Sequence, residues 1–226
     1  MKAAVMIAAK DLRVEFRSKE MISAMFLFSL LIVLAFRFGF SNAIESRSVG
    51  LPELASSALW ICFSFAAILG MYTSFAKEKD RETLEGLLLA PVDRSELFLG
   101  KALSSLVIVF AVDVLSIVFF GVFFSFDFGG QAVAVVVLAL LGSLALVLVG
   151  TLVAAISVNT RAREVLLPIL LIPLIAFSVI VPSVTATKNA IAGGIADSLP
   201  QVGPLVAFAA IFAVLGYLLF DYVMEG

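Results

Sequence analysis

The chain has 226 residues, of which 62% are hydrophobic and only 14% are charged, and its formal net charge is −2. A water-soluble domain cannot hide so large an apolar share, so the solvent around most of the chain must be a lipid bilayer. The net charge gives no basic field of the kind that nucleic-acid binding requires. Histidine is absent and Cys62 is the single cysteine, which excludes an intrachain disulfide and a Cys/His zinc cluster.

Residues 1–20 predict an amphipathic helix on the inner surface of the membrane. Apolar side chains recur at helical spacing: Val5, Ala9, Leu12 and Phe16. The opposite face is charged: Lys10, Asp11, Arg13 and Arg17. A frayed, charged tail is the alternative. A cleavable signal peptide fits less well, because the basic region of such a peptide is short.

Six stretches are long and apolar enough to cross the roughly 30 Å hydrocarbon core as helices. They comprise residues 21–40, 54–76, 98–124, 132–157, 164–182 and 203–223. Charge, glycine or proline bounds each of them. The predicted fold class is therefore an all-α membrane protein, with residues 1–226 forming a single transmembrane domain.

The distribution of lysine and arginine predicts the orientation. Twelve of the 15 basic residues fall on one side of the predicted spans, before the first, between the second and third, and between the fourth and fifth. The other side holds Arg37, Arg47 and Lys188. Because basic loops stay in the cytoplasm, both termini are predicted to be cytoplasmic and the protein to lie in the inner membrane.

The segment 77–97 is the longest polar stretch on the predicted cytoplasmic side. Asp80 or Thr83 can cap a short helix there. An apolar face is supplied by Leu84, Leu87 and Leu88. Asp93 and Glu96 then resemble a capping box at the start of the third span. The pattern predicts a short interfacial helix presented to the cytoplasm, and a solvated connector is the alternative.

The fifth span is interrupted by proline, and a weakly polar segment follows it. Pro168 and Pro173 lie within the span and Pro182 lies at its end. Proline removes a backbone donor and bends a helix, which membranes tolerate where protein or water satisfies the freed carbonyl groups. We interpret residues 183–202 as a partly inserted outer-leaflet hairpin or as an extracytoplasmic loop.

Two charged residues within the spans are candidates for function. Asp113 lies deep in the third span, where an ionised side chain costs roughly 2.5 to 3.5 kcal/mol. It is predicted either to contact the translocation path or to tether two helices, and a hydrogen-bonded packing residue is the simpler alternative. Arg37 lies near the outer end of the first span, where anchoring by snorkelling is favoured over substrate binding.

Signatures of catalysis are absent from the sequence. It contains no G-x-x-x-x-G-K-[ST] phosphate loop and no G-x-S-x-G elbow, and H-E-x-x-H is impossible without histidine. The chain is therefore predicted to have no catalytic residue and no metal site. Any ATP-driven function requires a separate partner subunit.

Three stretches resemble one known family. The segment FAKEKDRETLEGLLLAPVDRSELFLGK resembles the cytoplasmic segment of heme exporter protein B, the CcmB permease family of cytochrome c maturation. The opening KDLRVEFRSKE is similar to the charged N-terminal helix of that family. The stretch NTRAREVLLPILLIPLIAFSVIVP is similar to its proline-containing fifth span.

The resemblance implies an ABC-2-like (type V exporter) permease with six helices per subunit. It implies a homodimer with a separate cytoplasmic ATPase (CcmA-like) and further heme-handling membrane proteins (CcmC-like and CcmD-like). Heme would be the substrate, delivered to the extracytoplasmic face, or ATP would be used to release a heme-loaded chaperone. By this analogy a coupling helix would dock into the ATPase through Glu78, Asp80, Arg81, Glu82, Leu84 and Glu85.

Other functions fit the same residues. An ABC-2 permease for a drug, a lipid or a polysaccharide would share this architecture. A non-transporting membrane scaffold would use the cytoplasmic loop only to recruit a soluble partner. An ion-coupled carrier needs paired charges within the membrane, for which Asp113 alone gives weak support.

Overall fold

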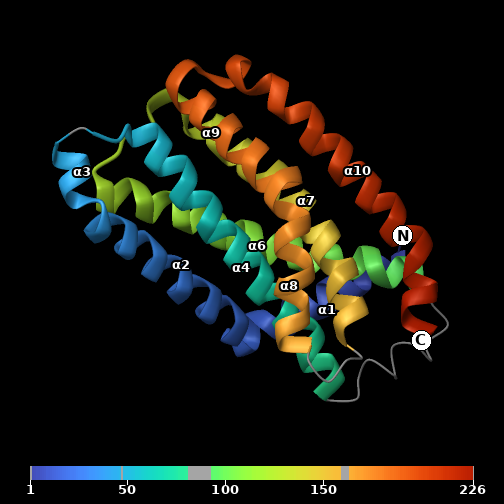
Figure 1. The fold of residues 1–226 in the computed structure, drawn as a ribbon. Coiled ribbons are helices and arrows are strands. Elements are labelled where there is room, and N and C mark those ends of the chain that lie inside the picture. The colour runs from blue at the N-terminus through green and yellow to red at the C-terminus, as the bar shows by residue number, and fades with distance from the viewer. Residues whose placement is uncertain (1, 47, 81–92, 159–162, 226) are drawn as a thin grey trace.

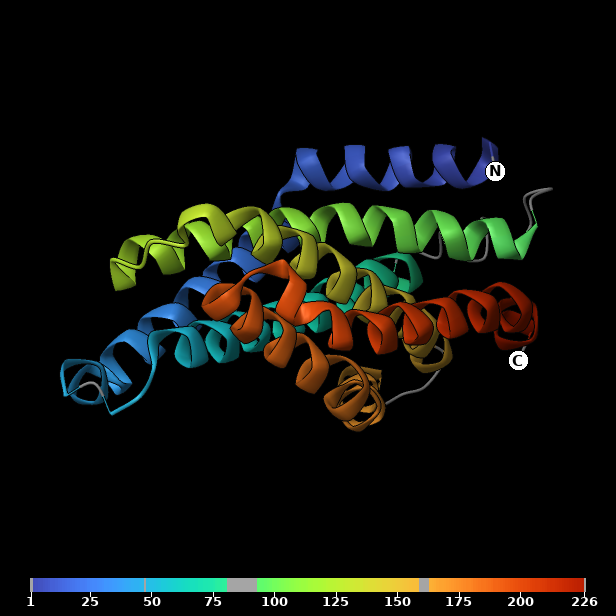
Figure 2. The same cartoon turned by 90° about the horizontal axis from the view of Figure 1, so that it is seen from above.

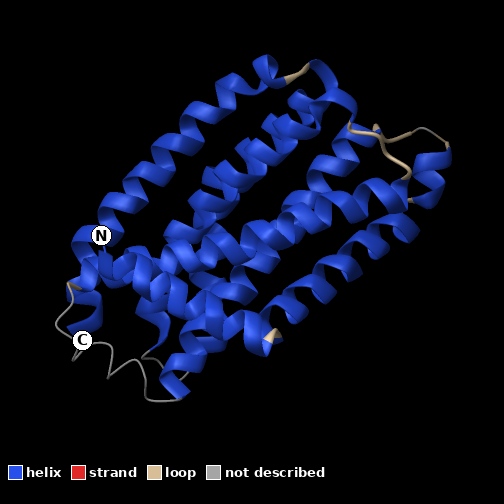
Figure 3. Ribbon diagram, turned by 180° about the vertical axis from the view of Figure 1, so that it is seen from behind, coloured by secondary structure: helices blue, strands red, loops and turns tan. Residues whose placement is uncertain are grey.

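A computed structural model describes residues 2–46, 48–80, 93–158 and 163–225. Throughout this part of the chain the secondary structure is helical and no strand occurs (Figure 3). The helices are α1 (Lys2–Ser18), α2 (Glu20–Gly39), α3 (Ser41–Glu45), α4 (Leu51–Asp80), α6 (Arg94–Phe124), α7 (Ala132–Val158), α8 (Arg163–Ile175), α9 (Val181–Gly193) and α10 (Ile195–Glu225). A 3₁₀ turn, η1 (Gly129–Gln131), precedes α7, and a π-helical turn, η2 (Ala176–Ile180), joins α8 to α9.

Six helical segments among the described residues are long and apolar enough to cross a membrane, as predicted. They are Glu20–Gly39, Leu51–Ala76, Arg94–Phe124, Gly129–Ser157, Val165–Gly193 and Ile195–Val223. The all-α fold class is confirmed, and the chain is a multi-pass membrane protein. We call these segments spans one to six.

The fifth and sixth spans are longer than the sequence suggested. The helical run that begins with α8 continues through η2 and α9 to Gly193, and α10 starts at Ile195. Pro182 lies in the first turn of α9, where its missing N–H is tolerated, and the π-helical turn before it accommodates the ring. Residues 183–202 are thus helical on both sides of Gly194, whose φ of 104° makes the reversal. Their depth in the membrane remains a prediction.

α4 forms the centre of the bundle and α10 its edge. In the most apolar window of each helix, 78% of the α4 residues are buried but only 17% of the α10 residues. Figure 1 shows α4 between α2 and the α8–α9 run, and α10 on the outer side of α7 and α9. Lipid is as apolar as the side chains, so close packing rather than hydrophobic burial must hold such helices together.

Two glycines in α7 receive large side chains from α4. The Trp60 ring of α4 lies against Gly142, and its indole Nε1 donates to Thr187 Oγ1 on α9 over 2.8 Å. Met71 lies against Gly150 in the same way. Small residues at these positions of α7 therefore permit close packing against α4.

Candidate functional site

The two ends of the bundle differ in what they carry. One end holds α1, the end of α4, the start of α6 and the end of α10, and we call it the α1 end (Figure 1). The opposite end holds α3 and the reversal between α9 and α10. The predicted coupling loop starts at the α1 end. Glu78 and Asp80 belong to the last turn of α4, whereas four other predicted coupling residues lie outside the described residues: Arg81, Glu82, Leu84 and Glu85.

α1 lies against the first half of α6, outside the bundle of spans (Figure 2). Its Ala4, Ile7 and Ala8 are buried there. Gly100 permits this approach, because a Cβ at that position would lie 2.8 Å from the Ala4 carbonyl oxygen. The backbone N–H of Ala3 donates to Glu96 Oε2 over 3.1 Å, so the first turn of α1 is capped from α6.

A buried ion pair joins the same two helices. Lys101 Nζ lies 3.0 Å from Asp11 Oδ2, and the Lys101 side chain is only 2% exposed. The same ammonium group lies 5.6 Å from the centre of the Phe75 ring on α4. Asp11 was predicted on the charged face opposite the apolar row, and the structure turns its carboxylate toward α6, away from the exposed basic side chains of that face. Lys101 is one of the twelve basic residues predicted to be cytoplasmic, and its side chain is buried at this end between α1, α4 and α6.

Glu15 fixes the corner between α1 and α2. Its Oε1 accepts hydrogen bonds from the backbone N–H groups of Met21, at 2.7 Å, and Ile22, at 3.1 Å. N–H groups in the first turn of a helix have no acceptor within that helix, so the Glu15 carboxylate supplies one. The helix dipole also favours a negative charge at this position. Lys19 makes the corner itself with a left-handed φ of 56°. Glu15, which is only 5% exposed, thus fixes the direction of α1 relative to span one.

The start of α6 is also bound to the end of α10. Arg94 Nη1 donates to the Asp221 carbonyl oxygen over 3.1 Å, and its Nε lies 3.8 Å from Asp221 Oδ1. The predicted capping box is not formed, because the Asp93 side chain makes no capping hydrogen bond and Glu96 instead receives the N–H of Ala3. The first two turns of α6 therefore connect α1, α4 and α10.

Asp113 lies in the interior of the bundle, fully buried on α6. Its Oδ2 accepts a short hydrogen bond from Ser143 Oγ on α7. Its Oδ1 has no hydrogen-bond partner among the described residues. This hydrogen bond joins the third span to the fourth.

Arg37 lies in the last turn of α2, at the end opposite α1. Its Nε donates to the carbonyl oxygen of Phe123 over 3.2 Å, near the end of α6. A cation is favoured at the carbonyl end of a helix, so the guanidinium ties span one to span three. The structure does not bring Arg37 and Asp113 together, because one lies at an exposed end and the other in the interior.

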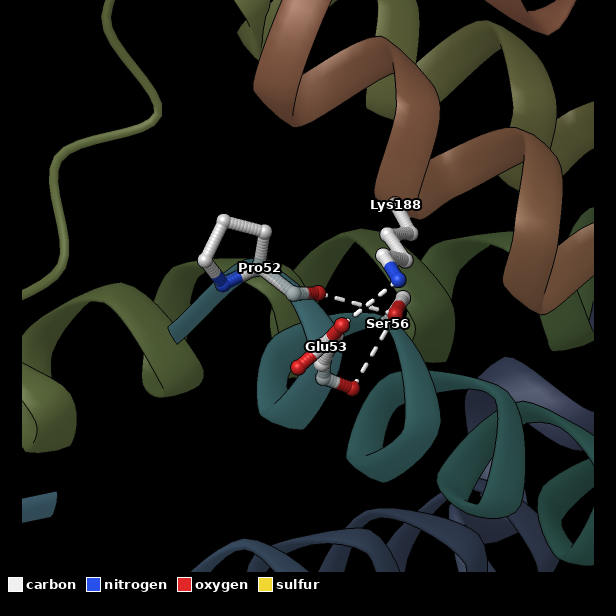
Figure 4. Close-up of polar contacts among 4 residues, drawn as sticks. All are labelled: Pro52, Glu53, Ser56 and Lys188. Atoms are coloured by element: carbon white, nitrogen blue, oxygen red, sulfur yellow. Dashed lines mark hydrogen bonds and ion pairs between the residues drawn. The ribbon is translucent and has the colours of Figure 1, made fainter. Parts of the chain in front are cut away.

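A second ion pair lies at the opposite end and was missed from the sequence. Glu53, in the first turn of α4, and Lys188 of α9 approach to 2.6 Å between Oε1 and Nζ (Figure 4). Ser56 Oγ donates to the carbonyl oxygens of Pro52 and Glu53 one turn away. Both charged side chains are about half exposed, at 51% and 45%, so the pair links two spans at little energetic gain.

Metal-binding geometry does not occur in the described part of the chain, where no three His, Cys, Asp or Glu side chains gather. The carboxylates of Asp11, Glu15 and Asp113 instead connect one helix to another. Sequence reasoning missed Glu15 and the Asp11–Lys101 pair, since helical periodicity does not say which face of α1 packs on protein.

Comparison with known protein families places the chain in one of them. A family model described as CcmB protein matches residues 2–220, a range that begins with α1 and ends inside α10. No curated protein matches the chain.

Proposed function

Because the chain belongs to the CcmB family, the heme-exporter permeases of cytochrome c maturation, we propose that it is the membrane subunit through which a separate ATPase drives heme delivery. Heme is the substrate in this proposal, and the chain itself catalyses no reaction. ATP acts only through the partner subunit. The observation that carries the proposal is the family match over residues 2–220.

The ATPase is proposed to dock at the α1 end, through the segment 77–97. The contacts of α6 support this position. Its first two turns are bound to α1 through Asp11–Lys101 and to α10 through Arg94–Asp221. A displacement of the chain just before α6 would therefore move three helices together. Such a connected element is what a nucleotide-driven closure needs in order to reach the spans.

The charge pattern of the chain supports a cytoplasmic α1 end. Twelve of the 15 basic residues fall on that side in the predicted topology. We therefore propose that both termini are cytoplasmic, that the membrane is the inner membrane, and that two copies form the core of the complex. CcmC-like and CcmD-like membrane proteins are the further partners proposed.

Reversing two charges of the predicted coupling helix is expected to release the ATPase. The variant is Arg81→Glu with Glu85→Lys, which keeps the net charge and reverses the local order on which charge-based docking depends. We expect the wild-type chain to co-purify with an active ATPase encoded beside it, and the variant to lose at least about tenfold in bound ATPase, equivalent to about 1.4 kcal/mol.

The matched control is Glu53→Lys with Lys188→Glu, which exchanges a half-exposed ion pair at the opposite end. This variant should retain the ATPase. If wild-type protein binds no ATPase, the exporter proposal fails and a scaffold or carrier takes its place. Equal loss in both double variants would show a folding effect and would contradict docking at the α1 end.

Asp113 is proposed to act as a helix contact, rather than as a charge in the translocation path. Its described hydrogen bond is with Ser143 on the neighbouring span, and Arg37 is proposed likewise to hold helices together. Asp113→Asn keeps an oxygen that accepts from Ser143, so we expect near wild-type heme attachment to a reporter cytochrome c. Asp113→Ala should lower the free energy of unfolding by about 1 to 3 kcal/mol.

Thermal unfolding in detergent and reporter assembly in cells together check this expectation. Ser143→Ala should lose part of the same free energy, and combining it with Asp113→Ala should add little. Loss of cytochrome c assembly in a fully stable Asp113→Asn protein would instead place the carboxylate in the transport path.

A further inference from the structure

α1 presents three different faces along its length. Positions four or eleven apart share a face of a helix. The face with Ala4, Ile7 and Ala8 is buried against α6. The second face is apolar and outward, and it carries Val5, Ala9 and Phe16. The third face carries cations and points away from the protein.

The apolar outward face is far more exposed than helix packing requires. Val5 is 59% exposed and Phe16 is 60% exposed. Ala4, the residue next to Val5, lies on the buried face and is only 7% exposed. An exposed aromatic ring and an exposed branched side chain in one row indicate an apolar environment outside the protein. α6 already occupies the other apolar face, so this row has no partner within the described part of the chain.

The charges of α1 are sorted by sign. Both acidic side chains turn toward the protein, Asp11 to Lys101 and Glu15 to the first N–H groups of α2. The exposed basic side chains stand on the outside: Lys2, Lys10, Arg13 and Arg17. Lys10 pairs with Asp11 over 3.1 Å, at the border between the two sets. The charged side chains that α1 turns outward are therefore all basic, and they lie beside an apolar row.

We propose that α1 binds anionic phospholipid headgroups, with Val5, Ala9 and Phe16 inserted among the acyl chains and Lys2, Arg13 and Arg17 on the phosphates. A row of apolar side chains next to a row of cations complements the layered chemistry of an anionic leaflet. Because Glu15 and Asp11 fix α1 to α2 and α6, lipid bound to this helix holds the start of span three in place. The proposal concerns the chain alone and does not depend on heme or the ATPase.

Titration of phosphatidylglycerol onto the purified full chain in phosphatidylcholine–detergent micelles tests the charge requirement. Thermal unfolding is the readout, and anionic lipid should raise the unfolding temperature of the wild type more than phosphatidylcholine does. Each cation near the surface contributes about fivefold in affinity, so the Lys2→Gln, Arg13→Gln, Arg17→Gln variant should need on the order of a hundredfold more lipid. These side chains are exposed, so the fold should be unaffected.

The conservative variant Arg13→Lys, Arg17→Lys keeps the charge and should respond to lipid as the wild type does. Lys188→Gln removes one cation at the opposite end and should also respond normally. An unchanged titration in the triple glutamine variant would overturn the proposal, as would equal loss in the two-lysine variant.

Spin labels in vesicles test where the faces lie. Labels are placed at Ala9→Cys on the apolar row and Met6→Cys on the basic side, each with Cys62→Ser, in vesicles of equimolar phosphatidylcholine and phosphatidylglycerol. We expect oxygen to relax the label at position 9 strongly and a water-soluble nickel reagent to relax the label at position 6. Nickel access at both positions would overturn lipid insertion. Protection of position 9 only after an ATPase is added would assign this face to a protein instead.

Discussion

Asp11→Ala is expected to destabilise the protein by roughly 3 kcal/mol, because it removes the Asp11 carboxylate from a buried ammonium group. Lys101 is 1% exposed, and Asp11 Oδ2 lies 3.0 Å from its Nζ. The lost pair also joins α1 to α6, so α1 should become accessible to limited proteolysis. Thermal unfolding of the detergent-solubilised chain and digestion at the α1–α2 corner measure the two effects.

Two controls separate the ion pair from the general effect of losing a carboxylate. Asp93→Ala removes an exposed carboxylate just before α6 that makes no capping bond, and it should change stability by no more than about 0.5 kcal/mol. Asp11→Ala with Lys101→Met replaces both charges by apolar groups and should recover much of the loss, as buried pairs often allow. An Asp11→Ala protein as stable as Asp93→Ala would show that the pair contributes nothing.

Gly142→Ala is expected to destabilise by about 3 kcal/mol despite adding only one methyl group. A Cβ at this position would lie 2.0 Å from Cη2 of Trp60, a ring that is fully buried and held by Thr187. The ring cannot yield without moving α4 away from α7 or breaking its hydrogen bond. A fall in the unfolding temperature and a changed Trp60 fluorescence spectrum are the expected observations, since this is the single tryptophan.

Gly203→Ala is the matched control, because it makes the same change within α10 where nothing lies within 4 Å of the added Cβ. Alanine restricts the unfolded chain and favours helix, so this variant should gain up to about 1 kcal/mol. The two substitutions should thus have opposite signs. A Gly142→Ala protein that unfolds at the wild-type temperature would contradict the position of the Trp60 ring.

The six spans could be predicted because a helix that crosses lipid must be apolar over roughly 20 residues, which is a local property of sequence. The helices of the fifth and sixth spans extend beyond their predicted bounds, because the prediction relied on local signals of a loop. Pro182 and the glycine pair near 194 suggested a loop, whereas the π-helical turn before Pro182 let the helix continue. That turn depends on packing against neighbouring helices, which periodicity does not record.

The candidate site was predicted only in part. Asp113 and Arg37 were found because a charge within an apolar span is conspicuous, but their partners Ser143 and the Phe123 carbonyl are distant in sequence. The amphipathic character of α1 was evident from its spacing. The contact of α1 with α6 could not be predicted, because the buried residues Ala4, Ile7 and Ala8 are as apolar as the exposed outward row.

Composition and local pattern alone identify a membrane protein with six spans and a basic side, and the family to which it belongs. These properties follow from composition and local pattern, because lipid imposes the same demand on every residue that meets it. The three-dimensional packing of the helices determines which charges are buried together, as for Asp11 and Lys101, and which glycine contacts the Trp60 ring. Such contacts join residues many turns apart, and only the arrangement of the helices in space determines which of them meet.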